Sequence, residues 1–298
     1  MQTSLDIAVY ELNSRVITDA IVEAARRGRT VRVVTDDRSA ADAKMTFREL
    51  RAAGIPVVAD TNPSALMHNK FAIIDRAVVW TGSWNYTDGA TYANNENAIA
   101  LEDAEVAARY QQVFDHLFAG RFGKERPAAP VATTRLHGIA VLFAPENPIL
   151  AELMSKVVGA RRSIEFLTFS FTLDELAQQL RAAAARGVAV RGIFEKALAG
   201  TARGPAGSVV RTLCHPDSQA TLRFDSNPRY LHHDAFVIDG QIMITGSLNF
   251  SRAALQRNDE NVVMIPDAAL AKRFENEFSR LWATGVAPDP AACADKPA

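Results

Sequence analysis

Hydrophobic and polar residues follow one another along the chain in the pattern of an α/β protein. Apolar, β-branched runs at residues 31–34 and 188–194 are typical of strands, and each follows a segment of helical periodicity that ends at a glycine. Later segments place aromatic residues four positions apart, as in Tyr110, Phe114 and Phe118. This spacing predicts a helix whose aromatic residues lie in the core. The chain is therefore expected to pack helices on sheets.

The same pattern occurs twice. Residues 67–75 read MHNKFAIID, and residues 231–239 read LHHDAFVID. The match continues in the same register from TGSWNY at 81–86 to TGSLNF at 245–250. A repeat of this length indicates an internal duplication. We therefore predict two homologous α/β halves related by a pseudo-two-fold axis.

The repeats set the expected domain boundaries. The prediction is a first half at 1–122, a linker rich in Pro, Ala and charge at 123–137, a second half at 138–286 and a tail at 287–298. A helical segment at 147–160 precedes the first strand of the second half and has no counterpart ahead of the first. Either the natural N-terminus is missing, and with it a candidate export signal or anchor, or this family member lacks the helix.

Composition and charge exclude several classes of protein. With 48% hydrophobic and 22% charged residues, the chain is neither disordered nor fibrous. Thirty-three basic and 34 acidic residues leave a net charge of −1, so no global basic field attracts nucleic acid or anionic lipid. No apolar run approaches the ~18 residues of a membrane span. The two cysteines, Cys214 and Cys293, suggest neither a disulfide framework nor a metal site, and the cellular location stays unknown.

Each repeat places a histidine at the start of an expected strand. Because side chains alternate between the faces of a strand, His68 and Lys70 point to the same side. A neutral imidazole can attack phosphorus, and an ammonium stabilises the negative charge of the transition state. Ser83 and Asn85 add neutral hydrogen-bond donors to this half-site. Glu96 can orient an imidazole through its distal N–H.

The second half repeats this set of residue types with His232, Ser247, Asn249 and Glu260. If the pseudo-two-fold axis brings the halves face to face, one histidine can attack while the other protonates the leaving oxygen. The chain has no HExxH, DxDxDG or paired Cys/His spacing, so we expect neither a metal nor another cofactor.

These residues resemble the phospholipase D superfamily. His68, Lys70 and Asp75 match its HxKx₄D signature, and residues 82–85 and 94–97 match the trailing Gly-Ser-x-Asn and Asn-x-Glu-Asn motifs. The resemblance covers both halves. It implies a mixed sheet flanked by helices in each half, an active site between the halves and a covalent phosphohistidine intermediate.

Carried over position by position, the resemblance also implies individual roles. His68 is the expected nucleophile and His232 the expected acid, whereas Asp75 and Asp239 are expected to anchor the turn after each motif strand. The implied catalytic residues are His68, Lys70, His232, Glu96 and Glu260, and the implied substrate-binding residues are Ser83, Asn85, Ser247, Asn249 and Asp234.

The second motif departs from the signature at Asp234, where a lysine is expected. A unit charge 4 Å from a phosphate is worth roughly 4 kcal/mol at an effective dielectric constant of 20, so the aspartate repels what the lysine would attract. Three alternatives follow. Asp234 inactivates the protein; or Arg229, Arg252 or Arg257 restores the positive charge; or this half acts through His232 alone.

The predicted function is a metal-independent phosphodiester hydrolase, most similar to the group that contains a bacterial endonuclease and the mitochondrial cardiolipin hydrolase. A nucleic-acid backbone is slightly preferred as substrate over a phospholipid headgroup ester. The contrasting hypothesis is a phosphate-binding protein that Asp234 has made inactive. We expect no obligate protein partner and a monomer whose two halves form a pseudo-dimer.

Overall fold

The computed structural model describes residues 1–127, 132–134, 137–199 and 204–293. Within this part of the chain, two units form. Unit 1 contains residues 1–147 together with 246–248 and 253–263. Unit 2 contains residues 148–245 and 249–252 and those from 264 onward. A segment of the second repeat that includes Glu260 therefore belongs to the same unit as the whole first repeat.

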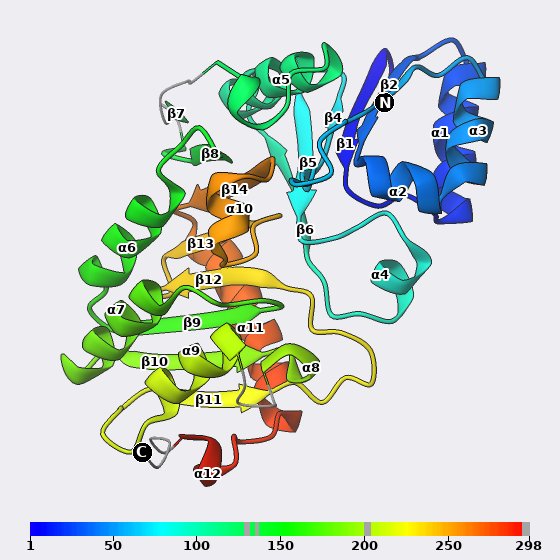
Figure 1. The fold of residues 1–298 in the computed structure, drawn as a ribbon. Helices are drawn as coiled ribbons and strands as arrows, with labels where there is room; N and C mark the ends of the chain where they lie inside the picture. The colour runs from blue at the N-terminus through cyan, green and yellow to red at the C-terminus, as the bar shows by residue number, and fades with distance from the viewer. Residues whose placement is uncertain (128–131, 135–136, 200–203, 294–298) are drawn as a thin grey trace. The chain divides into compact units, whose positions relative to one another are not determined.

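The first repeat forms a six-stranded mixed sheet in the order β3-β2-β1-β4-β5-β6 (Figure 1). Strand β1 pairs in parallel with β2 and antiparallel with β4, with Val9 opposite Lys70. The strands are β1 (Ser4–Val9), β2 (Thr30–Thr35), β3 (Val57–Ala59), β4 (Lys70–Ile74), β5 (Val78–Gly82) and β6 (Ala98–Glu102). The helices are α1 (Arg15–Arg26), α2 (Asp37–Asp42), α3 (Lys44–Ala52), α4 (Asp88–Tyr92) and α5 (Ala104–Phe118).

Helices cover both faces of this sheet, with α1 and α3 on one side and α5 on the other (Figure 1). On the first side, Val33 of β2 packs in one buried cluster with Phe47 and Leu50 of α3. On the other, Tyr110 and Phe114 of α5 are fully buried, as their four-residue spacing predicts. The strands are apolar on both faces because both faces are covered.

The strands of the second repeat follow the same order, β11-β10-β9-β12-β13-β14. This confirms the predicted α/β class and the two homologous halves. The strands are β9 (Ser163–Thr168), β10 (Ala189–Phe194), β11 (Thr221–Phe224), β12 (Asp234–Ile238), β13 (Ile242–Gly246) and β14 (Glu260–Ile265). The helices are α6 (Ile149–Gly159), α7 (Asp174–Ala185), α8 (Lys196–Ala199), α9 (Gly204–Cys214), α10 (Arg252–Gln256), α11 (Ala268–Thr284) and α12 (Pro290–Cys293).

The segment predicted as a linker has structure of its own. It contains a 3₁₀ turn at Gly123–Glu125, the buried Arg126 and strand β7 (Ala132–Thr133), which pairs with β8 (Ala140–Ala144) in unit 1. Residues 128–131 and 135–136 of the expected linker, and 294–298 of the expected tail, lie outside the described residues. Within the described part of the chain, every helix is too short or too polar to cross a membrane.

Asp75 and Asp239 occupy the turn that follows each motif strand. Asp75 accepts hydrogen bonds from the N–H groups of Thr3 and Ser4, which lowers the pKa of its carboxyl. Burial raises the pKa of Asp239, but hydrogen bonds from the N–H groups of Ser163, Arg162 and Arg161 outweigh it and lower that pKa. Each aspartate thus joins its turn to the start of the neighbouring strand, β1 or β9.

Replacing Asp239 by asparagine should lower the free energy of unfolding at pH 7 by about 1–3 kcal/mol, because the N–H groups lose a charged acceptor. The folded-state pKa of Asp239 is lowered, so its contribution is present above the unfolded pKa of about 3.9 and is lost as the pH falls through the folded pKa. Urea unfolding at pH 7 and pH 3 should therefore show a difference between parent and variant that shrinks in acid.

Asp217→Asn is the matched control, because this carboxylate is 79% exposed. It should change the free energy of unfolding by no more than about 0.5 kcal/mol. An Asp239→Asn variant as stable as the parent at pH 7 would contradict the anchoring role.

Cys214 and Cys293 form a disulfide, contrary to the sequence analysis. The bond joins the end of α9 to α12, two helices that pack together in unit 2. Sequence spacing did not suggest the pair because the two cysteines are 79 positions apart and only the fold brings them together. A structural disulfide is typical of proteins that work in an oxidising compartment.

Candidate active site

His68 and Lys70 lie side by side in unit 1. Lys70 is the first residue of β4, and His68 lies just ahead of that strand. The Lys70 Nζ atom is 3.0 Å from Nε2 of His68 and 3.2 Å from its main-chain oxygen. Both side chains are buried, with 5% of His68 and 2% of Lys70 exposed. An ammonium and an imidazole thus converge at one point, as the strand alternation predicts.

Glu260 is the carboxylate that holds His68. Its Oε2 atom lies 2.9 Å from Nδ1 of His68, although the two residues are 192 positions apart in sequence. A hydrogen bond from Nδ1–H to a carboxylate fixes the tautomer and leaves the Nε2 lone pair for nucleophilic attack. In the first half, Glu96 was the residue expected to orient an imidazole. The carboxylate comes from the second repeat instead.

Backbone hydrogen bonds keep Glu260 beside the histidine. The N–H of His68 donates to the main-chain oxygen of Asp259 at 2.9 Å. Two residues on, the N–H of Lys70 donates to Oδ1 of Asn261 at 3.2 Å. The residues on either side of Glu260 are therefore fastened to the HxK motif of the first repeat.

A buried group of charged residues also fixes Asp259, the residue directly before Glu260. The carboxylate of Asp259 accepts hydrogen bonds from the N–H of Gly123 and from the Arg126 guanidinium. Arg126 also pairs with Glu146, whose other oxygen lies 3.6 Å from Arg109. Removing one member would leave an uncompensated buried charge, which typically costs about 3–5 kcal/mol. This group explains why a segment of the second repeat packs within unit 1.

The two motif serines contact the motif glutamates. Ser83 Oγ donates to Glu96 at 2.7 Å, and Ser247 Oγ donates to Glu260 at 2.6 Å. Each serine oxygen also accepts a main-chain N–H fourteen residues further on, at 3.1 and 3.0 Å respectively. In this structure the serines therefore contact the carboxylates, and their role in binding the substrate stays a prediction.

Asn85 and Asn249 have the same exceptional environment in the two repeats. Among the described residues, the side-chain oxygens of both are buried and have no hydrogen-bond partner. A buried amide without a partner is costly, so such a group is often completed by a ligand or water. These oxygens accept hydrogen bonds, so they suit a donor such as water or a hydroxyl group, whereas only the Nδ2–H groups of the two asparagines could donate to a phosphate.

The second motif belongs to unit 2 and differs in detail. Asp234, which replaces the lysine, is 3% exposed, and its Oδ1 atom accepts the N–H of Phe169 at 3.3 Å. The neighbouring His233, the variable motif residue, lies 3.6 Å from Glu277 on α11. His232 packs its ring against Phe169. The aspartate is thus built into the end of β9 by a backbone hydrogen bond.

The three arginines considered as substitutes for the missing lysine lie in different places. Arg252 pairs with Glu175 at 2.8 Å and is 64% exposed. Arg229 lines a pocket of about 540 Å³ in unit 2 with Glu195 and Asp225. Arg257 lines a pocket of about 370 Å³ in unit 1. Arg252 is already engaged by a carboxylate, which weakens its case as a substitute.

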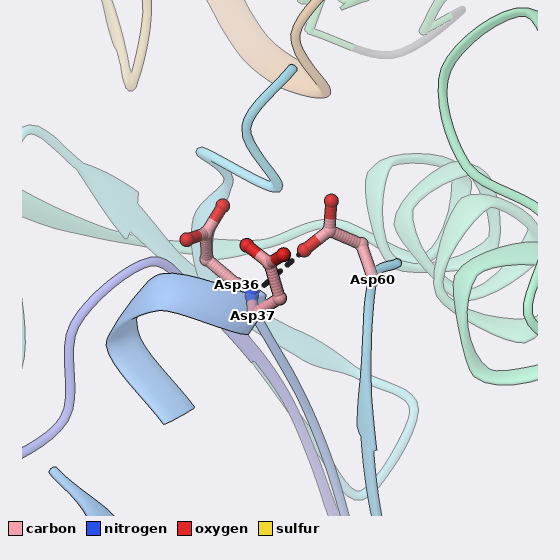
Figure 2. Close-up of side chains that lie close together, drawn as sticks. All are labelled: Asp36, Asp37 and Asp60. Carbon is pink, nitrogen blue, oxygen red and sulfur yellow. Dashed lines mark hydrogen bonds between the residues drawn. The ribbon is translucent and has the colours of Figure 1, made fainter. Parts of the chain in front are cut away.

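Acidic residues that the sequence analysis missed support the segment before each motif histidine. Figure 2 shows Asp36, Asp37 and Asp60, whose oxygens approach within 4.8 Å of one another. Asp36 caps α2 by accepting the N–H of Arg38 and also accepts the N–H of Met67 at 3.0 Å. Asp60 accepts the N–H of Asp37 at 2.8 Å, and burial raises the pKa of Asp60 to about 6. Backbone N–H groups therefore account for Asp36 and Asp60 without a cation.

The second repeat has an equivalent acidic residue, Glu195, which also accepts backbone N–H groups. Glu195 follows β10 as Asp36 follows β2, and it accepts the N–H of Leu231, directly before His232, at 2.7 Å. It also accepts the N–H of Ala197 at 2.8 Å. The signal in the sequence was an acidic residue at the same place after the second strand of each repeat. Asp36 and Glu195 thus each accept the backbone N–H of the residue that precedes a motif histidine.

Comparison with known proteins identifies the family. The family model described as "Cardiolipin synthase, PLD-like domain" matches residues 1–118 and 153–282, which cover both repeats. The chain therefore belongs to this family of the phospholipase D superfamily, and the resemblance found in the sequence is confirmed.

Curated relatives match about half of the chain. The mitochondrial cardiolipin hydrolase of Xenopus laevis is 34% identical over 135 residues, which are 44% of this chain and 60% of that protein. A phospholipase D of Rickettsia felis is 38% identical over 111 residues, 37% of this chain and 55% of that protein. The chain thus spans a little over half the length of these relatives.

A solved structure supports the fold over almost the whole chain. Phosphatidylserine synthase from Haemophilus influenzae Rd KW20 matches 96% of this chain and 82% of its own, with a TM-score of 0.71 and 14% identity. At this identity the likeness concerns the fold alone.

Proposed function

We propose that this protein hydrolyses phosphodiesters and that His68 is the nucleophile. The observation that carries the proposal is the pair of contacts on one imidazole, Glu260 at Nδ1 and Lys70 at Nε2. The carboxylate fixes the tautomer, and the ammonium, which faces the Nε2 lone pair in this structure, would turn to a phosphate oxygen when a diester binds and so free Nε2 for attack. Homologous proteins named as hydrolases and phospholipases support the same reaction class.

The proposed reaction has two steps. Nε2 of His68 attacks phosphorus, a P–N bond forms, the bond to the leaving oxygen breaks, and His232 gives that oxygen a proton. Water then attacks the phosphohistidine, its proton returns to His232, and the P–N bond breaks to restore His68. Glu260 stabilises the imidazolium character of His68 during attack. Lys70 and the side-chain N–H groups of Asn85 would donate hydrogen bonds to the non-bridging phosphate oxygens.

Phospholipid phosphodiesters are the favoured substrate class. The curated relatives are named for cardiolipin hydrolysis and phospholipase D activity. The net charge of −1 attracts neither nucleic acid nor anionic lipid, so it does not separate the two substrate classes. The names of the relatives therefore carry the preference for lipid, which reverses the slight preference for nucleic acid that the motifs alone suggested.

The experiment compares hydrolysis of cardiolipin vesicles, phosphatidylcholine vesicles and single-stranded DNA in EDTA. We expect hydrolysis of lipid to exceed that of DNA and to be unaffected by the chelator. Faster hydrolysis of DNA would overturn the substrate class, and loss of all activity in EDTA would overturn the metal-independent mechanism.

Asp234→Asn tests the departure from the signature. The amide keeps the size of the side chain and an oxygen for the N–H of Phe169 but removes the negative charge. We expect kcat/KM for an anionic diester to rise on the order of tenfold, about 1.4 kcal/mol, because a repulsion is removed. An unchanged kcat/KM would mean that the charge is already compensated, and a loss would mean that Asp234 takes part in the reaction.

A further inference from the structure

An aromatic ring packs against the motif histidine in both repeats. The ring centroid of Tyr10 lies 4.8 Å from that of His68, and the planes are tilted by 59°. The ring centroid of Phe169 lies 4.5 Å from that of His232, with a tilt of 52°. These separations fall within the range of favourable ring contacts.

The two aromatic residues reach this position through the same strand geometry. Each directly follows the first strand of its repeat, β1 or β9, where that strand pairs with the motif strand. The N–H of Tyr10 donates to the main-chain oxygen of Asn69 at 3.0 Å. In the second repeat, the N–H of Phe169 donates to the main-chain oxygen of His233 at 3.1 Å. The contact therefore recurs even though the sequence separation between ring and histidine differs by five residues between the repeats.

Each aromatic residue also contacts the third residue of its motif, through its ring in the first repeat and through its backbone N–H in the second. The Lys70 Nζ atom is 5.6 Å from the centre of the Tyr10 ring, within the range of a cation–π contact. In the second repeat, Asp234 accepts the N–H of Phe169. The aromatic residue thus contacts both chemical groups of each motif.

We propose that Tyr10 and Phe169 are positioning residues that hold the motif imidazoles in the orientation needed for attack and proton transfer; this inference rests on the proposed function. Glu260 and Lys70 contact the edge of the His68 ring at its two nitrogens, whereas Tyr10 packs against the ring itself. The packed aromatic ring restrains tilting of the imidazole, which contacts at the nitrogens alone restrain less. The role needs an aromatic face and no hydroxyl, since phenylalanine fills it in the second repeat.

The test uses Tyr10→Leu, Tyr10→Phe and, as a control in the core of unit 1, Phe47→Leu, each assayed in EDTA below its melting temperature. We expect Tyr10→Leu to lower kcat about 10- to 100-fold, with KM within about threefold of the parent, because misplacement of a reacting group costs rate up to about 100-fold. Tyr10→Phe should keep kcat within about threefold. Phe47 is fully buried in the unit 1 cluster and away from the motif, so its variant should lose stability without this loss of kcat.

Parental kcat in Tyr10→Leu, or equal losses in Tyr10→Leu and Phe47→Leu, would overturn the proposal. A second measurement separates it from failure of the proposed function. Side-chain ¹⁵N NMR relaxation of His68 should show a more mobile ring in Tyr10→Leu than in the parent and in Tyr10→Phe, whether or not the parent turns over a diester. Unchanged ring mobility would refute the positioning role, whereas an inactive parent with the expected mobility change would refute only the function.

Discussion

His68→Ala is expected to lower turnover of a phosphodiester by about 1,000-fold or more. The variant removes the only atom proposed to form a bond to phosphorus, and loss of a nucleophile typically leaves only residual binding and electrostatic effects. The measurement is the initial rate with a chromogenic diester in EDTA. The loss should appear in kcat.

His137→Ala is the matched control for this variant. His137 is another histidine of unit 1, half exposed and paired with Asp103 at 2.7 Å. It should retain the parent's rate. A His68→Ala enzyme that turns over as the parent does would show that the bond to phosphorus forms elsewhere.

Glu260→Gln is expected to lower kcat by about 100-fold or more. The glutamine amide can donate to Nδ1 of His68, which favours the tautomer with the proton on Nε2, the nitrogen that has to attack. In the well-studied histidine triad, the equivalent amide substitution costs about 10⁴-fold for this reason. The loss should fall mainly on kcat, because Glu260 is proposed to act through its contact with His68.

Glu102→Gln provides the comparison for Glu260, since Glu102 is an exposed carboxylate at the end of β6. Its rate should match the parent's. Full activity in Glu260→Gln would show that the 2.9 Å contact with His68 does not set the tautomer.

The sequence could predict those features that depend on neighbouring residues. Strand periodicity placed His68 and Lys70 on one side, and their side chains do converge at 3.0 Å. The repeated motifs predicted two homologous halves, which the strand order and the family match confirm. Asp75 and Asp239 lie in the turns just past their strands, as predicted, although the N–H groups that they accept belong to residues that lie 71 and 76 positions away in sequence.

The sequence could not predict partners that only the fold brings together. Within one repeat, Glu96 was the nearest candidate to orient His68, but packing of residues 253–263 in unit 1 supplies Glu260 instead. The disulfide between Cys214 and Cys293 depends in the same way on α12 packing against α9. Spacing along the chain carries no information on such long-range contacts.

The role of the motif serines illustrates a different difficulty. A serine next to a proposed phosphate site is chemically suited to bind substrate, and also to bind a neighbouring carboxylate. The structure adds the contacts of Ser83 with Glu96 and of Ser247 with Glu260, which the sequence did not indicate. The unpartnered amide oxygens of Asn85 and Asn249 likewise emerge only from a full account of buried hydrogen bonds.

The central claim is that phosphorus becomes covalently bound to His68. The most direct test is a single turnover in EDTA with a ³²P-labelled diester, quenched in alkaline denaturant because phosphohistidine is labile in acid, followed by mass spectrometry of the peptides. We predict a labelled peptide that contains His68 and is absent in His68→Ala. Label on His232 instead, or turnover that requires added metal and leaves no labelled histidine, would contradict the account.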